Sequence, residues 1–344
     1  MKRFALFLLL LITIAAHGAD IETLALDPRA GEPVNGFPNW GERLIHQWMN
    51  RARVDPQTDL KGCGATCGET ACYSPKAPLY WNHALNRAAR FHADEMIQQG
   101  FFAHDSTCKV VSGIDALYPA GCNGAASCAC TGGLTGCRNG CTPWSERVGM
   151  FNARATGEII AGGADPHQAF YLWLWEASLS PSCAFTNLNG HRYLILESLG
   201  SVGVGVSGNR SVGNFGSGGA AHPIPSGSHY PQQAATVEAW ANWYDAKPPR
   251  SASVFVDGKC IPMRLGRGTG TNGAWVATVT GVGSGCPRYY FSFIDGNGTE
   301  VTYPATGTLA IGASCPDWTS ARVRGTCSSA QIPQQTSRRR SVRR

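Results

Sequence analysis

The sequence predicts an α+β protein in which a region of mixed helices and strands is followed by a small all-β domain. Two observations carry this prediction. Apolar residues recur at helical spacing in three segments before residue 180, and the pattern changes to a period of two after Ser251. We expect residues 251–327 to form a β-sandwich of the immunoglobulin-like kind.

The N-terminus has the pattern of a secretory signal peptide. Lys2 and Arg3 precede an apolar run, and Ala16-His17-Gly18 supplies the small residues of a cleavage site. No later stretch reaches the roughly 20 apolar residues that a membrane-spanning helix needs. We therefore expect residues 1–18 to be removed and residues 19–40 to form an extended lead-in. The protein would then be secreted to the extracellular space without a transmembrane segment.

Three segments are predicted to be helices with one apolar face each. The first covers residues 41–54. The second begins after Asn82, which can cap its start, and ends at Gly100, which suits the left-handed conformation. The third opens with Asp165 as its cap and Pro166 as its first residue. Glu176 would follow Trp173 by three positions on the same face of this helix.

Several later segments are predicted to be strands or turns. Residues 202–206 alternate Val and Gly, which is typical of a strand that another backbone approaches closely. Residues 207–235 are rich in Gly, Ser and Pro and predict a long loop or a hairpin tip, and a short turn would carry His191. The strands expected in the C-terminal domain are Val254 to Val256, Trp275 to Val279, Tyr289 to Ile294, and Val301 to Tyr303.

Fourteen cysteines in an exported chain predict disulfide bonds. They form three groups: Cys63, Cys67 and Cys72 with the distant Cys183; six from Cys108 to Cys141; and Cys260, Cys286, Cys315 and Cys327. With Cys183 in the first group, each group has an even number and can close by itself. The pairing within the groups stays open. The middle group lies in residues 107–143, which we interpret as an insertion without apolar periodicity that cross-links must order.

The net charge of +6 is concentrated at the C-terminus. Five arginines lie among residues 338–344, and the rest of the chain is nearly neutral. The sequence therefore lacks the basic face that binding of nucleic acid requires. We expect residues 328–344 to form a disordered Arg-rich tail.

Four side chains are candidates for chemistry: His104, Glu158, Glu176 and His191. Imidazole nitrogen and carboxylate oxygen suit zinc or another divalent cation. Equally, a carboxylate that orients a histidine can make it a general base. The sequence has no HExxH helix, GxSxG elbow, Walker loop or dinucleotide fingerprint, so the residues alone leave both alternatives open. We interpret His222 and His229 as histidines of a flexible loop, and Glu146, Arg147 and His92 as residues of structural pairs or core contacts.

Eight blocks resemble the CAP superfamily, named for cysteine-rich secretory proteins, antigen 5 and pathogenesis-related proteins and also called the SCP domain. The blocks are Asn50-Arg51-Ala52-Arg53-Val54-Asp55-Pro56, Leu79-x-Trp81-Asn82-x-x-Leu85, His92-Ala93-x-x-Met96, Phe102-x-His104, Gly157-Glu158-x-Ile160-Ala161, Trp173-x-x-Glu176, Gly190-His191-Arg192-x-x-Ile195-Leu196, and Val202-Gly203-Val204-Gly205-Val206. They arrive in the family's order, and the Gly-His-Arg form is similar to its bacterial branch. The resemblance predicts a CAP domain over residues 41–247.

The resemblance implies an α-β-α sandwich with a cleft in which His104, Glu158, Glu176 and His191 converge. Some members of the family bind zinc or another divalent cation there, and others bind sterols or fatty acids in apolar grooves. The insertion starts directly after His104, which predicts that it lies at the rim of the cleft.

The implied function is non-catalytic, since no general reaction is established for the family. We expect a secreted monomer that binds a divalent cation and a sterol, fatty acid, protein or cell-surface partner. Two alternatives stay open. One is a metal-dependent secreted hydrolase, such as a protease. The other is a structural or adhesive extracellular module in which the cleft is vestigial and the C-terminal domain binds.

Overall fold

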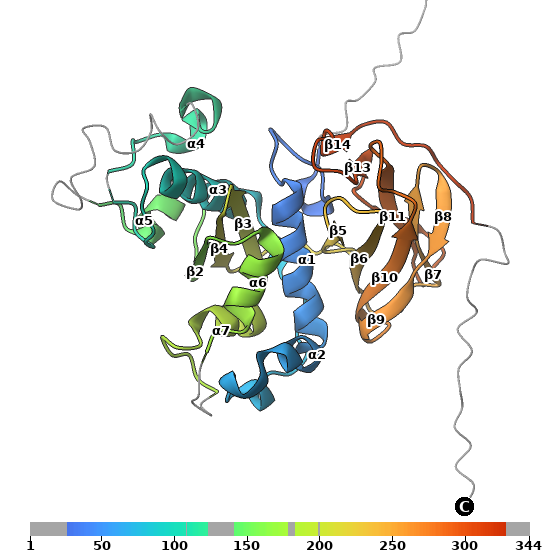
Figure 1. The fold of residues 1–344 in the computed structure, drawn as a ribbon, viewed down its shortest axis with the longest axis horizontal. Helices are drawn as coiled ribbons and strands as arrows, with labels where there is room; N and C mark the ends of the chain where they lie inside the picture. Colours follow the sequence, from blue (N-terminus) through green and yellow to red (C-terminus); the bar gives the residue numbers. More distant parts are fainter. Residues whose placement is uncertain (1–25, 108, 123–140, 178–182, 199, 328–344) are drawn as a thin grey trace, which may run out of the picture.

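The computed structural model describes residues 26–107, 109–122, 141–177, 183–198 and 200–327. Helices and strands both contribute, which confirms the α+β class. One part of the molecule has helices around a four-stranded sheet, and the other part consists of strands (Figure 1). The expected signal peptide and the expected Arg-rich tail lie outside the described residues.

The sheet of the mixed part has the strand order β1-β3-β4-β2. These strands are β1 (Tyr80–Trp81), β3 (Ser201–Ser207), β4 (Arg210–Gly216) and β2 (Gly157–Gly162). The β1–β3 pair is parallel and the other pairs are antiparallel. β4 lies where the sequence predicted a loop. Nearly all of its residues are buried, so the polar-apolar alternation that would reveal a strand is absent.

Helices cover both faces of this sheet. The first face packs on α3 (His83–Gln98), where Ile160 and Val212 join the apolar residues of that helix. The opposite face, with Ile159 and Val204, packs on three other helices. These are α1 (Trp40–Val54), α6 (Pro166–Leu174) and α7 (Gly190–Glu197). Ile159 and Ile160 take opposite sides because successive residues of a strand alternate between faces.

The second predicted helix is present as α3, with both of its expected ends. The Asn82 side chain accepts a hydrogen bond from the Leu85 N–H at 3.1 Å, and Gly100 has a φ of 69°. The predicted close approach to the Val-Gly strand is also confirmed. A Cβ added at Gly203 or Gly205 would collide with the backbone of α3. Only glycine at these positions lets the helix lie so near the sheet.

α6 has the predicted start but is shorter than predicted. Asp165 accepts a hydrogen bond from the Gln168 N–H at 2.8 Å, and the helix ends at Leu174. The prediction that Glu176 lies on this helix was therefore wrong. Trp175 leaves helical geometry and donates its indole N–H to the Asp59 carbonyl at 2.9 Å, which turns the chain away. His191, expected on a turn, belongs to α7.

Two sheets form the all-β part and share one apolar cluster. The first has the order β5 (Gly227–Tyr230), β6 (Thr236–Tyr244), β10 (Asn272–Thr280) and β9 (Arg264–Gly268). The second has the order β14 (Trp318–Thr319), β13 (Thr308–Ala310), β11 (Arg288–Ile294), β7 (Ser251–Val256) and β8 (Lys259–Pro262). β12 (Glu300–Tyr303) also pairs with β11. The four strands predicted after Ser251 are thus present.

The predicted domain boundary between residues 247 and 251 cuts through the first of these sheets. β5 and β6 precede that boundary, yet β6 pairs with β10 along its whole length. Trp243 of β6 packs in the all-β cluster, whereas Trp240 packs against the helices of the mixed part. β6 therefore contributes to both hydrophobic cores.

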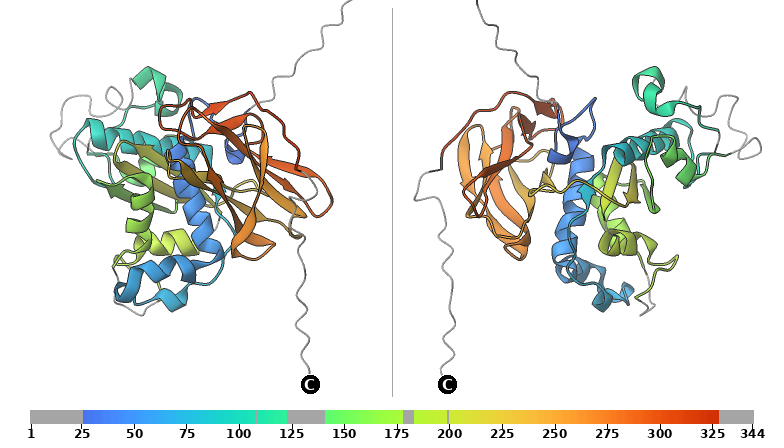
Figure 2. Two further views of the ribbon diagram at one scale, coloured as in Figure 1. Left: turned by 45° about the vertical axis from the view of Figure 1, so that its right-hand side comes forward. Right: turned by 180° about the vertical axis from the view of Figure 1, so that it is seen from behind.

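α1 lies between the two parts of the molecule (Figures 1 and 2). Asn39 and Glu42 form a capping box at its start, and Gly41 through Val54 are all buried. Its predicted apolar face packs with α6 and α7. Its polar face meets the all-β part: Gln47 donates to the Asn242 side chain at 2.7 Å, and Asn50 donates to Ser226 at 3.2 Å.

Each of the four described disulfide bonds joins two cysteines of the same predicted group, either the first or the last. They are Cys63–Cys67, Cys72–Cys183, Cys260–Cys327 and Cys286–Cys315. In the middle group, Cys122 and Cys141 are disulfide-bonded, and the other four cysteines lie outside the described residues. Within the described part of the chain, none of the helices combines the length and apolar composition needed to cross a bilayer.

The described part of the insertion shares its apolar core with α3, an interaction that was not predicted beside the expected cross-links. Ile114 and Tyr118 join Phe91 of α3 and Phe151 in one cluster. Arg87 of α3 also forms an ion pair with Asp115. The remaining short helices of the molecule are η1 (Pro28–Ala30), α2 (Pro56–Leu60), η2 (Lys61–Thr66), η3 (Thr70–Cys72), α4 (Ile114–Leu117), η4 (Ala120–Cys122) and α5 (Trp144–Gly149).

Candidate functional site

The four candidate residues form two histidine–glutamate pairs. His104 Nδ1 lies 3.1 Å from Glu158 Oε1, and His191 Nδ1 lies 3.0 Å from Glu176 Oε1. Each pair joins segments that are far apart in the sequence or separated by a turn. A carboxylate at Nδ1 favours the tautomer with a proton there, which leaves Nε2 with its lone pair.

The first pair is built on β2 and on the segment after α3. Glu158 is fully buried on β2, and Arg147 of α5 donates from Nη2 to its Oε2 at 2.5 Å. Arg147 also donates from Nη1 to the His104 carbonyl at 2.9 Å. Burial raises the pKa of the Glu158 carboxyl, but the Arg147 charge and the His104 hydrogen bond outweigh it, so the pKa is lowered overall. Glu158 is therefore an ionised carboxylate.

A buried polar network lies behind this pair. His92 Nδ1 lies 2.5 Å from Glu95 Oε1, and the Ser106 hydroxyl donates to the same oxygen at 2.6 Å. Arg147 donates to Ser106 at 3.1 Å and links the network to Glu158. His92 Nε2 bonds the Ala103 carbonyl at 2.9 Å. These contacts support the structural interpretation of His92 and fix the segment that carries His104.

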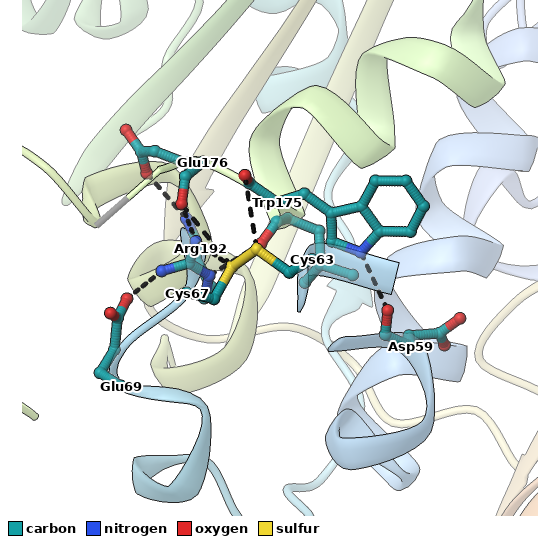
Figure 3. The surroundings of a disulfide bond; sticks show 8 residues. Asp59, Cys63, Cys67, Glu69, Trp175, Glu176 and Arg192 are labelled. Atoms are coloured by element: carbon teal, nitrogen blue, oxygen red, sulfur yellow. Dashed lines mark hydrogen bonds and ion pairs between the residues drawn. A yellow bond between two sulfur atoms is a disulfide. The ribbon is translucent and has the colours of Figure 1, made fainter. Parts of the chain in front are cut away.

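The second pair sits at the start of α7. Glu176 accepts the backbone N–H of His191 at 2.9 Å, as expected for a carboxylate at a helix N-terminus. Arg192 follows in the sequence, and its side chain lies beside Glu176 (Figure 3). It donates to the Glu176 carbonyl, to the Glu69 carboxylate, and to Cys67 Sγ at 2.8 Å. All of the Arg192 side chain is buried.

The Cys63–Cys67 disulfide supports the turn that carries Glu176. Cys63 Sγ lies 3.6 Å from the Trp175 carbonyl, and Cys67 lies beside Arg192 (Figure 3). The sequence indicated a stapled loop here but gave no sign that it would lie under a candidate site residue. That proximity depends on the early end of α6.

A contact of Leu194 connects the helix of the second pair with the start of β2. Leu194, one turn after His191, packs on Gly157, where an added Cβ would lie 2.7 Å from its side chain. Gly157 directly precedes Glu158. The His104 side chain is 46% exposed and that of His191 is 31% exposed, so both rings reach solvent. Among the described residues, neither Nε2 has a hydrogen-bond partner.

The donor set limits the kind of metal that this region can hold. No group of three or more His, Cys, Asp or Glu side chains within the described ranges is placed to bind a metal ion. Oε2 of Glu158 already accepts a hydrogen bond from Arg147, and Oε2 of Glu176 accepts one from the backbone N–H of His191 at the start of α7. Within the described ranges, these side chains therefore do not form a closed four-ligand centre.

The remaining candidate histidines have structural partners. His229 is buried on β5, not on a loop, and its Nδ1 lies 2.9 Å from the Tyr289 hydroxyl. Burial lowers its pKa to about 4. His222 Nδ1 lies 2.8 Å from the Ile224 carbonyl, and burial lowers its pKa as well. The prediction that both histidines lie on a flexible loop was therefore wrong for His229, because both of its ring nitrogens have partners inside the all-β part.

Exposed apolar side chains gather on α6. Leu172 and Trp175 border a groove of about 840 Å³ that also includes His167 and Tyr171. This groove is separate from both histidine–glutamate pairs.

The comparisons of this chain with protein-family models, curated proteins and solved structures found no match.

Proposed function

We propose that this chain is a secreted, disulfide-rich CAP-type protein that binds an exchangeable divalent cation without catalysing a reaction. The observation that carries the proposal is the matched geometry of the two pairs. In each pair a glutamate holds Nδ1 of a partly exposed histidine, so that Nε2 is the atom presented to a ligand.

His104 and His191 are the residues that would hold the cation. Imidazole nitrogen is a preferred ligand of zinc, and a bound cation would supply a Lewis-acidic point for a polar partner. The glutamates orient the rings from behind and raise the basicity of Nε2. The eight ordered sequence blocks and the disulfide bonds support the CAP-type and extracellular parts of the proposal.

The surroundings of the glutamates favour binding over catalysis. A general base works best with a pKa near the working pH, yet the pKa of Glu158 is lowered. Arg147 also occupies the oxygen of Glu158 that does not face His104. Glu176 is engaged by the backbone of α7. Neither carboxylate is arranged to accept a proton from a substrate.

Titration of the purified chain with Zn²⁺ and Co²⁺, followed by calorimetry, tests the proposal. We expect binding by the native chain and a loss of at least about tenfold in affinity in a His104→Ala/His191→Ala variant. His222→Ala is the matched control, because this ring lies apart from the pairs, and it should bind like the native chain.

Two results would contradict the proposal. The first is the absence of cation uptake by the native chain, or equal uptake by the double variant. The second is turnover of a peptide panel by the native chain that a Glu158→Gln variant abolishes, which would replace binding with metal-dependent hydrolysis.

A further inference from the structure

Arg147 stands out among the buried charges because it contacts both members of the first pair. Its side chain is fully buried. Nη1 donates to the backbone carbonyl of His104 at 2.9 Å, and Nη2 donates to Glu158 Oε2 at 2.5 Å. His104 and Glu158 belong to separate segments, so one guanidinium fixes the position of one relative to the other.

We propose that Arg147 is the positioning residue that sets the tautomer and the direction of the His104 ring. By occupying Oε2, it turns the other carboxylate oxygen, Oε1, toward His104 Nδ1 at 3.1 Å. By binding the His104 carbonyl, it fixes the backbone from which that ring projects. The ring then keeps its proton on Nδ1 and directs Nε2 to solvent.

The fork of the guanidinium is essential to this role. Two donors in one rigid plane reach two acceptors on different segments, whereas an ammonium group is a single compact charge. Arg147 makes no contact that would bring it to a ligand, since Glu158 and the segment of His104 lie between. It acts through the pair and does not bind the cation.

An Arg147→Lys variant tests this inference, with Arg90→Lys as the matched control. Arg90 is another largely buried arginine, paired with the buried Glu42, and it has no contact with His104. Nitrogen NMR of the imidazoles at about pH 8, where an ordinary histidine is neutral, reports the tautomer without any metal. We expect the Nδ1-protonated form of His104 to dominate in the native chain and in Arg90→Lys. In Arg147→Lys, both tautomers should be populated.

The affinity for Zn²⁺ gives a second readout, and this one rests on the proposed function. We expect a loss of about tenfold in Arg147→Lys and no change in Arg90→Lys. If the native chain binds no cation, the proposed function fails, while the tautomer measurement still decides the role of Arg147.

Retention of the Nδ1-protonated form in Arg147→Lys would overturn the inference. So would an equal change of the His104 signal in the control, because that would show a general loss of stability. If Arg147→Lys does not fold, an Arg147→Met/Glu158→Gln variant, which removes both buried charges together, is compared with Glu158→Gln alone, so that only Arg147 differs. The amide oxygen of Gln can still accept from Nδ1, so we expect a smaller Nδ1-protonated fraction of His104 in the double variant. Equal fractions in the two variants would overturn the inference.

Discussion

Buried charged residues in this chain each have specific partners. Arg43 pairs with Asp317 at 2.5 Å, and Arg53 donates to the Ile195 carbonyl at 2.7 Å. Arg147 and Arg192 are likewise buried with carboxylate partners. An unpaired buried charge costs several kcal/mol, so these partners are a condition of the fold.

Two buried histidines make the stability of the protein sensitive to acid. Burial lowers the pKa of His46 and of His229 to about 4 in the folded chain. The ordinary histidine pKa of 6.5 applies once they are exposed by unfolding. Between these values the unfolded chain binds more protons, so the free energy of unfolding falls as the pH decreases from 6.5 to about 4.

Urea unfolding at several pH values tests this prediction. Each histidine contributes a slope of up to about 1.4 kcal/mol per pH unit in that window. A His229→Gln variant should show a shallower slope than the native chain, and an unchanged slope would contradict the assignment.

Glu158 affects the free energy of unfolding at lower pH than the two histidines. Its folded pKa is lowered from 4.5, so its contribution is present above that value and is lost as the pH falls through its folded pKa.

At the scale of elements, the contact between α3 and β3 depends on the absence of side chains. Gly203 and Gly205 face the helix backbone, and Ala89 and Ala93 bring small side chains to the same interface. This close packing sets the height of α3 above the sheet. It also sets the place of the segment after α3, which carries His104.

A Gly205→Ala substitution is predicted to lower the free energy of unfolding by about 1–3 kcal/mol, because the Cβ of the alanine would collide with the backbone of α3. Urea denaturation followed by tryptophan fluorescence measures the change. Gly149→Ala on α5 is the control. No atom lies within 4 Å of its added Cβ, and the change should be neutral or stabilising by up to about 1 kcal/mol. Equal effects in the two variants would refute the packing explanation.

The sequence predicted helices better than strands, for a physical reason. Caps such as Asn82 and Asp165 act within one turn, so their signal is local. β4 and β5 are almost entirely buried, and their Gly- and Ser-rich residues show no alternation. The pairs of the candidate site were predicted only through the order of the sequence blocks. The contact of Arg147 with His104 was not predicted, because 43 positions separate the two residues.

At the scale of the whole molecule, α1 and β6 join the two parts into one structure. α1 is buried on all sides, with its polar face bonded to Asn242 and Ser226. The segment before α1 also reaches the all-β part, where Glu32 accepts hydrogen bonds from Thr306 at 2.5 Å. A chain divided at residue 250 would leave β6 on the N-terminal piece and expose Trp243 and the edge that pairs with β10.

Residues 251–327 are therefore predicted not to fold when expressed alone. This fragment lacks β5 and β6 and loses Val237, Ala241 and Trp243 from its apolar cluster. Near-ultraviolet circular dichroism and amide NMR dispersion measure the outcome. A fragment of residues 222–327 restores both strands and should recover sheet signal. Cooperative unfolding of the shorter fragment would contradict the prediction and would revive the sequence-based domain boundary.

The sequence by itself determined the local features: the helix caps, the glycine-spaced strand, the even cysteine groups and the period-two strands after Ser251. These depend on interactions within a few residues or on the count of one residue type. Only the tertiary structure decided that the polar face of α1 is buried, that β6 serves two cores, and that Arg147 holds His104 to Glu158. Each of these depends on which distant segments meet, and periodicity carries no information about that.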